Sequence, residues 1–193
     1  MKIFTRLYDL ALQWSKHPHA PRYLAGLSFA ESSFFPVPVD VMLAPMALAK
    51  PGKAWRFALI ATVASVAGGV MGFLIGYFAI DMILPVLEKL GYMKSYESAV
   101  GWFNEWGLIA VFIAGFSPIP YKVFTITAGA LSMMLLPFIL ISLVARGARF
   151  YLVAGVMVWG GEKMEAGLRR YMDIMGWAVV IIAVILYIFI KNH

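Results

Sequence analysis

The chain has 193 residues, of which 62% are hydrophobic and 13% charged, with a formal net charge of +6 and no cysteine. So apolar a composition excludes an ordinary soluble domain and predicts an integral membrane protein, and the missing cysteines exclude disulfides, thiolate catalysis and cysteine metal sites. Basic loops that face anionic lipid explain the positive charge better than nucleic acid does, so we expect membrane lipids, and no nucleic acid, as partners.

The first 22 residues predict an amphipathic helix and a linker. Apolar side chains recur there at helical spacing with basic residues between them, at Ile3, Leu7, Leu10 and Trp14. No small-residue cleavage site follows a short apolar core, so we expect an interfacial helix and not a signal peptide. His17 and His19 flank a proline without a third ligand nearby, and we expect no metal or other cofactor.

The apolar segment 23–49 is interrupted by helix-breaking and charged residues, namely Glu31, Pro36, Pro38, Asp40 and Pro45. Proline removes a backbone donor and clashes with the preceding turn, so one continuous helix is excluded. Non-helical backbone at membrane depth must be buried in protein or reached by water. We therefore predict a re-entrant hairpin of two half-helices joined by a Pro-rich turn.

Residues 57–80 lie in a run of 24 uncharged residues between Arg56 and Asp81. This run is long enough to cross a hydrocarbon core of about 30 Å, so it predicts a transmembrane helix. Three glycines stand four residues apart in it, at Gly68, Gly72 and Gly76. This spacing indicates backbone-to-backbone packing against another helix.

The segment 107–134 repeats the interrupted pattern. "FSPIPYKV" at 116–123 matches "FFPVPVDV" at 34–41 with an offset of 82 residues, but Lys122 stands where the first copy has Asp40. Pro118 and Pro120 again break the helix, which predicts a second re-entrant hairpin. Pro38 and Pro120 are expected to begin the outgoing half-helices, which puts Asp40 and Lys122 in their first turns.

Two further spans are expected. Residues 137–161 are long enough to cross the membrane but contain Arg146 and Arg149, whose face must therefore turn toward protein or a cavity. Residues 174–190 are apolar throughout and predict a C-terminal transmembrane anchor after the loop that begins at residue 162.

Charge in the loops predicts the orientation of these elements. Loop 50–56 has three basic residues and no acid, whereas the predicted loop 81–105 has four acids and two lysines. The first is therefore cytoplasmic in character, and the two hairpins would enter from opposite faces. We expect an all-α polytopic membrane protein with an inverted repeat of re-entrant hairpin plus transmembrane helix: repeat 1 at 23–80, repeat 2 at 107–161, and a separate C-terminal part at 162–193.

Three basic residues are candidate substrate ligands. Lys122 opposes the positive end of its helix, a location that a bound anion would explain, since free backbone N–H groups and an ammonium form a phosphate-type site. Arg146 and Arg149 are three residues apart on one helical face, and arginine forks fit phosphate oxygens. The alternatives are that Lys122 pairs with Glu31 or Asp40, and that the two arginines neutralise the same acids.

Glu31 and Asp40 are candidates for proton coupling, because carboxylates in a low-dielectric cavity have raised pKa values. Permanent pairing with the basic residues is the alternative. The sequence contains no Ser–His arrangement, no His-Glu-x-x-His and no aspartate cluster with metal-ligand spacing, so we do not expect an enzyme.

Several motifs together resemble the DedA superfamily, also known by its VTT domain, and most closely its small YqaA-type branch. They are "FAESSFFPVPVDVMLAPMAL", "PIPYKVFTITAG" and "RGARF". The resemblance implies two facing hairpins and lipid movement across membranes, of undecaprenyl phosphate or phosphatidylethanolamine in bacteria. It matches Glu31 and Asp40 to the family's acidic pair, Lys122 to its hairpin cation and Arg149 to its helix arginine. This chain departs from the family in having no arginine before the second proline turn, and lysine instead of arginine at 122.

These observations together predict a multi-pass protein of the bacterial inner membrane that moves a phosphate-bearing lipid between leaflets, with Glu31 or Asp40 exchanging a proton. A proton-coupled transporter of a small solute fits the same charges, and a non-transporting factor for membrane homeostasis or assembly is a third alternative.

Overall fold

The computed structural model describes residues 17–33, 38–117 and 120–160, and this part of the chain is helical apart from short connections. Its helices are α2 (Ala20–Ser33), α3 (Asp40–Ala49), the 3-10 helix η1 (Pro51–Lys53), α4 (Ala54–Lys89), α5 (Met93–Phe116), α6 (Tyr121–Ala130) and a last helix, Leu135–Gly160, which we call the closing helix. The all-α prediction is confirmed for these residues. Most of the predicted interfacial helix, the 174–190 anchor, Pro36 and Pro118 lie outside the described residues.

In the described part of the chain, three helices are long and apolar enough to cross a membrane: Pro51–Lys89, Tyr96–Phe116 and Leu135–Gly160. This confirms a multi-pass membrane protein. By contrast, α2 and α3 have 14 and 10 residues. At 1.5 Å per residue they reach about 21 and 15 Å, less than a hydrocarbon core of about 30 Å.

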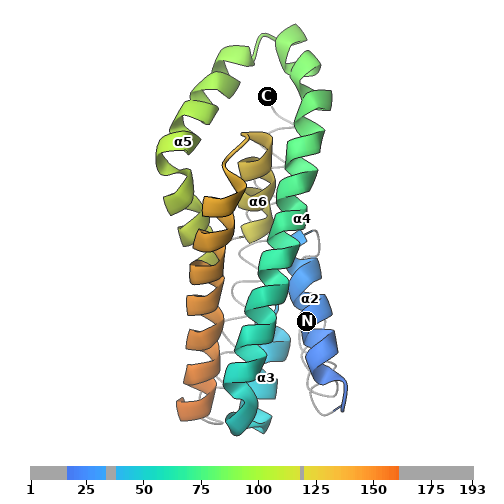
Figure 1. Cartoon of the computed structure of the whole chain (residues 1–193), viewed down its shortest axis with the longest axis vertical. Coiled ribbons are helices and arrows are strands. Elements are labelled where there is room, and N and C mark those ends of the chain that lie inside the picture. Colours follow the sequence, from blue (N-terminus) through green and yellow to red (C-terminus); the bar gives the residue numbers. More distant parts are fainter. Residues whose placement is uncertain (1–16, 34–37, 118–119, 161–193) are drawn as a thin grey trace, which may run out of the picture.

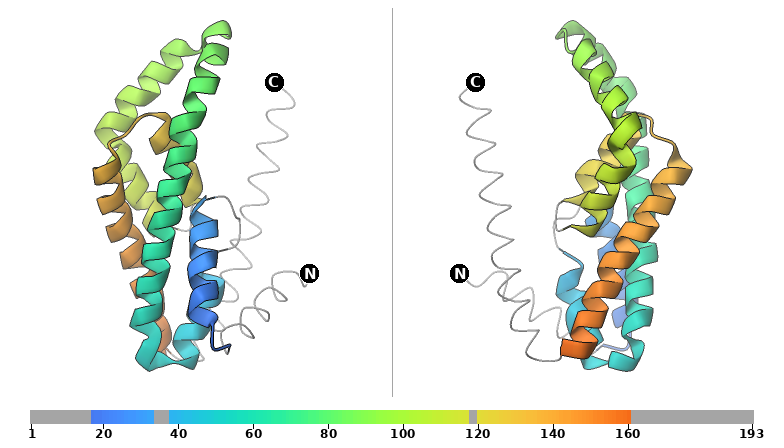
Figure 2. Two further views of the ribbon diagram at one scale, coloured as in Figure 1. Left: turned by 45° about the vertical axis from the view of Figure 1, so that its right-hand side comes forward. Right: turned by 90° about the vertical axis from the view of Figure 1, so that its left-hand side faces the viewer.

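The long helix α4 runs the length of the molecule (Figure 1). The first residues of α2 and α4 and the last residues of the closing helix lie at one end, which we call the basic end (Figures 1 and 2). The turn between α4 and α5 forms the opposite end. The closing helix is antiparallel to α4, and the short helices α2, α3 and α6 lie beside α4 (Figure 1).

Glycines let α2 and α6 pack directly on α4. A Cβ added at Gly68 would lie 2.2 Å from the carbonyl oxygen of Phe29 in α2, and one added at Gly76 would lie 1.9 Å from that of Ile126 in α6. Gly129 of α6 is equally close to α4, with 1.8 Å to the oxygen of Phe73. The predicted backbone-to-backbone packing is confirmed.

The predicted loop at 81–105 is wrong, because the structure is helical through most of it. α4 continues to Lys89, and α5 begins at Met93. A Schellman turn ends α4: Gly91 has φ 74°, its N–H donates to Glu88 O at 3.1 Å, and Tyr92 N–H donates to Leu87 O at 2.9 Å. The charged residues that follow the apolar run, such as Asp81, continue α4, and the helix ends only at Gly91, where φ is positive.

The part of segment 107–134 before its prolines differs from the predicted half-helix, because it is the end of the long helix α5. α5 has 24 residues, and its apolar part is itself a candidate span. Its inward side chains recur at helical spacing, at Tyr96, Val100 and Phe103. The charged residues of α5, which suggested a loop, are all exposed: Lys94, Glu97 and Glu105.

New helices begin just after Pro38 and Pro120, as predicted, whereas Pro45, expected to interrupt the segment, lies inside α3 and does not end it. α3 begins at Asp40, and Pro120 is the N-cap of α6, so Asp40 and Lys122 both lie in the first turn of a ten-residue helix, as predicted. The order of helix, proline break, ten-residue helix and long helix therefore occurs twice along the chain. Re-entrance into a bilayer and an inverted symmetry axis stay predictions.

Candidate functional site

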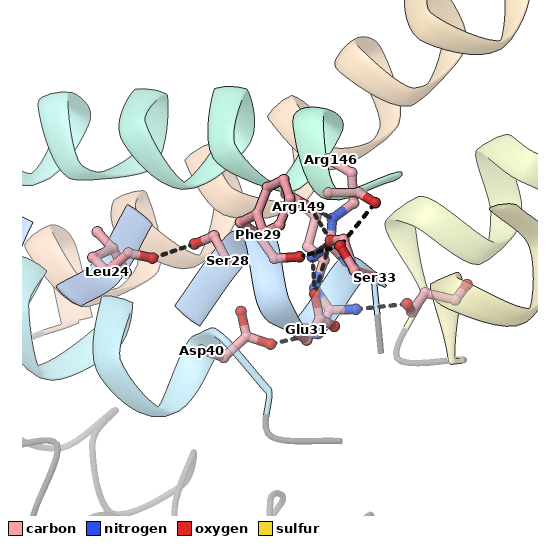
Figure 3. Close-up of polar contacts among 12 residues, drawn as sticks. Leu24, Ser28, Phe29, Glu31, Ser33, Asp40, Arg146 and Arg149 are labelled. Carbon is pink, nitrogen blue, oxygen red and sulfur yellow. Dashed lines mark hydrogen bonds and ion pairs between the residues drawn. The ribbon is translucent and has the colours of Figure 1, made fainter. Parts of the chain in front are cut away.

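Four of the predicted site residues meet in the interior, where the short helices contact the closing helix (Figure 3). Arg146 pairs with Glu31 of α2, and Arg149 pairs with Asp40 of α3. The sequence left open whether these acids pair with the arginines, and the structure shows both pairs.

Arg146 is almost completely enclosed. Its Nη2 lies 2.5 Å from Glu31 Oε2 and 3.5 Å from Ser32 Oγ, and its Nε donates to Ser65 Oγ at 2.6 Å. Ser32 and Ser65 are themselves linked at 2.6 Å. The Arg146 side chain is only 2% exposed, so this charge is satisfied by protein groups and not by water.

Two aromatic rings complete the surroundings of Arg146. Its Cζ lies 5.1 Å from the ring centroid of Tyr121 and 4.6 Å from that of Phe150. Tyr121 directly follows the second proline break, and its hydroxyl donates to Ser142 at 2.5 Å. Cation–π contacts strengthen when water is excluded, so both rings hold the guanidinium in place.

Arg149 has a different environment. Its Nη2 binds Asp40 Oδ2, and its Nη1 donates to the carbonyl oxygen of Ser117 at 2.5 Å. Asp40 begins α3, and Ser117 caps the C-terminus of α5, so this one side chain joins the two proline breaks. The Arg149 and Asp40 side chains are 16% and 13% exposed, and Asp40 Oδ1 accepts no hydrogen bond.

Lys122 is half-buried in the first turn of α6, where its carbonyl oxygen accepts a hydrogen bond from Thr125 Oγ1 at 2.9 Å.

Sequence reasoning did not find Ser65, Tyr121 or Ser142. The only local signal was a polar side chain inside an apolar helix, and its partners lie on other helices. Among residues 17–33, 38–117 and 120–160, no group of three or more His, Cys, Asp or Glu side chains is arranged to hold a metal.

The two ion pairs join the short helices α2 and α3 to Leu135–Gly160, one of three helices long and apolar enough to span a membrane in the described part of the chain. This arrangement defines a multi-pass membrane protein with an internal charged layer. The sequence model of the VTT domain matches residues 37–158, well over half of the chain. The chain therefore belongs to the VTT-domain family, also called DedA, as its motifs indicated.

Two of three similar relatives match over nearly the whole chain. An uncharacterized protein of Haemophilus influenzae is 49% identical over 192 residues, which cover 100% of both chains. An uncharacterized protein of Histophilus somni is 48% identical over 191 residues, 99% of this chain and 100% of the relative. One from Methanocaldococcus jannaschii is 29% identical over 112 residues, 58% of this chain and 66% of the relative. No solved structure matches the chain.

Proposed function

We propose that this protein moves a phosphate-bearing lipid, a phospholipid or a polyprenyl phosphate, between the leaflets of the bacterial inner membrane. The observation that carries the proposal is the position of Arg149, which holds one oxygen from each proline break. A phosphate group offers two acceptor oxygens to an arginine fork. It would therefore replace both the Asp40 carboxylate and the Ser117 carbonyl, and thereby release the two breaks from each other.

The surroundings of the two arginines support different roles for them. Nε and Nη2 of Arg146 donate to protein oxygens, and two aromatic rings lie against its guanidinium, so we assign it, with Glu31, to holding α2 against the closing helix. Arg149 is more exposed and has an exchangeable set of acceptors. In the proposal Arg149 makes the direct phosphate contact, Lys122 adds positive charge at the start of α6, and Arg146 acts through the position of its helix.

Asp40 is the favoured proton carrier of the two acids. Its Oδ1 accepts no hydrogen bond, so a proton can be added there without breaking one. A neutral Asp40 would bind Arg149 less strongly, because the charge-assisted part of the pair is lost. Proton uptake would thus favour exchange of the carboxylate for a phosphate.

Reconstitution into liposomes with a fluorescent phospholipid in both leaflets tests the proposal. A membrane-impermeant reductant bleaches only the outer leaflet unless lipid crosses. We expect wild-type vesicles to bleach beyond the level of protein-free vesicles. Arg149→Lys should slow this phase about tenfold, because it keeps the charge but loses one charge-assisted hydrogen bond.

Lys122→Ala should also slow the phase, and Asp40→Asn should make its rate independent of pH, because residue 40 then stays neutral. Lys89→Ala, at an exposed position at the end of α4, should leave the rate unchanged. Each variant is first shown to be folded by size exclusion and circular dichroism. Wild-type vesicles that bleach no further than protein-free ones would exclude movement of ordinary phospholipid. Equal slowing by Lys89→Ala would show that the effect is not specific to the charged layer.

A further inference from the structure

Three large aromatic side chains gather on the surface at the basic end. Trp55 of α4 stacks on Tyr151 of the closing helix, with ring centroids 5.9 Å apart and planes at 19°. Trp159 meets Trp55 edge-on at 6.1 Å. We call these three residues the aromatic ledge. Its rings come from two antiparallel helices, and Trp55 and Trp159 are 104 residues apart in the sequence.

The aromatic ledge is exposed, and a glycine shapes it. Trp55, Tyr151 and Trp159 are 42%, 37% and 81% exposed. Gly155 is buried beneath them, and a Cβ there would lie 3.3 Å from the Trp159 ring and 3.4 Å from the Trp55 ring. The rings therefore close over Gly155 and leave their outer faces open. Exposed indole and phenol rings of this kind are typical of the headgroup level of a bilayer.

Apolar and basic groups continue the ledge in opposite directions. Toward the middle of α4, on the same stripe as Trp55, Leu59 and Val63 are 51% and 55% exposed and offer an apolar surface to acyl chains. In the other direction, exposed cations surround the start of α4, at Lys50, Lys53 and Arg56. No acidic residue occurs between 41 and 80 or between 106 and 161. Within the described residues none of these three cations forms an ion pair.

We propose that the aromatic ledge and the cations of segment 50–56 form a binding site for an anionic phospholipid, distinct from the charged layer of the interior. The phosphate and the negative head group bind the cations, the rings pack at the level of the glycerol, and the acyl chains run along Leu59 and Val63. A protein partner is disfavoured because it would have to cover Leu59 and Val63, which face lipid. A free anion is disfavoured because it would bind the cations but make no use of the aromatic rings. The site does not depend on the transport proposal.

A fluorescence experiment on single-tryptophan proteins tests the site. The chain has six tryptophans. In one protein Trp55 is kept and the other five are replaced by phenylalanine, which retains a ring at 159. It is reconstituted in phosphatidylcholine with increasing fractions of phosphatidylglycerol brominated on its acyl chains, which quenches nearby indoles. We expect quenching of Trp55 at fractions below those needed with brominated phosphatidylcholine.

Three changes define the chemistry of the site. Lys50→Gln, Lys53→Gln and Arg56→Gln together should abolish the preference, with a loss of about fivefold per cation. Tyr151→Ala should weaken it without changing its dependence on salt. Raising the ionic strength should reduce the preference of the protein with intact cations, since a Debye length of about 10 Å at 0.1 M shortens at higher salt.

Helix α5 supplies a control. Trp106 is 51% exposed and stands next to Glu105, so a protein that keeps only Trp106 should show no preference for anionic lipid. Equal quenching of Trp55 by the two brominated lipids, or an equal preference at Trp106, would overturn the proposal. Loss of the preference on adding millimolar inorganic phosphate would also overturn it, since the site would then bind a free anion.

Discussion

At the scale of single residues, the interior separates two arginines that the sequence places on one helical face. Arg146 is bound by a carboxylate, two serines and two rings, whereas Arg149 binds one carboxylate and one carbonyl at the two proline breaks. Removing two charges from water costs several kcal/mol per ion, which only good geometry and further hydrogen bonds offset. The environment of Arg146 meets this condition most fully, and it makes the loss of any one partner costly.

Glu31→Gln should lower the free energy of unfolding by about 3–5 kcal/mol, because it leaves the charge of Arg146 buried without a counter-charge. The measurement is unfolding in detergent micelles, followed by circular dichroism. Arg146→Gln alone should also destabilise the protein, and the double variant Glu31→Gln with Arg146→Gln should lose less than the sum of the two. Additive effects would show that the pair contributes no coupling energy.

At the scale of elements, α4 is the platform on which both interrupted segments are assembled. Gly68 accepts α2, while Gly72 and Gly76 accept α6, so the two short helices are fixed relative to each other through one long helix. In lipid the hydrophobic effect does not drive helices together, and close van der Waals contact replaces it. The positions of the proline breaks, and so the meeting of Asp40 with Arg149, depend on this contact.

Gly129→Ala tests the platform. The added Cβ would meet the backbone of Phe73 at 1.8 Å, which no side-chain rotation relieves, so α6 must move away from α4. We expect a loss of stability at or above the roughly 1–3 kcal/mol usual for overpacking. Gly101→Ala, in α5 with nothing within 4 Å, is the matched control.

The control should leave stability unchanged or raise it by up to about 1 kcal/mol, since alanine is the better helix former. Both variants are compared by thermal unfolding in the same detergent. If Gly129→Ala unfolds like the wild type, α4 and α6 do not pack as closely as the structure shows.

At the scale of the whole molecule, charge is distributed unequally between the two ends. Segment 50–56, which leads into α4, carries Lys50, Lys53 and Arg56 without a nearby acid in the sequence. Residues 81–105, on either side of the α4–α5 turn, carry Asp81, Glu88, Glu97 and Glu105 with two lysines. Basic segments stay on the cytoplasmic side during insertion, so this asymmetry orients the molecule in the membrane.

Single cysteines can report this orientation directly, because the natural chain has none. Gly52→Cys lies in η1 with open space around it, and Tyr92→Cys lies in the turn after α4, where the natural tyrosine is 57% exposed. In intact cells whose periplasm is accessible, an impermeant maleimide should label residue 92 but not residue 52. Residue 52 should react only after the inner membrane is permeabilised.

The reverse pattern would invert the orientation. Labelling of both residues in intact cells would contradict a membrane-spanning α4.

The sequence by itself determined the membrane class, the helix breaks at Pro38 and Pro120, the glycine packing face and the identity of the charged residues. Each of these follows from local chemistry: apolar length, the missing proline N–H, the missing glycine Cβ and the cost of a charge in lipid. It did not predict the helices between residues 81 and 105, because their charged, exposed faces resemble a loop in composition.

Only the tertiary structure decided which charges meet. Glu31 and Arg146 are 115 residues apart, and Asp40 and Arg149 are 109 apart. Their contact depends on how α2 and α6 pack on α4 and where the closing helix then lies. The same packing brings Ser65 and Tyr121 to Arg146, and Trp55 to Tyr151. Residue types and spacing along the chain leave these pairings open, because side chains on separate helices are brought together only by the packing of those helices in three dimensions.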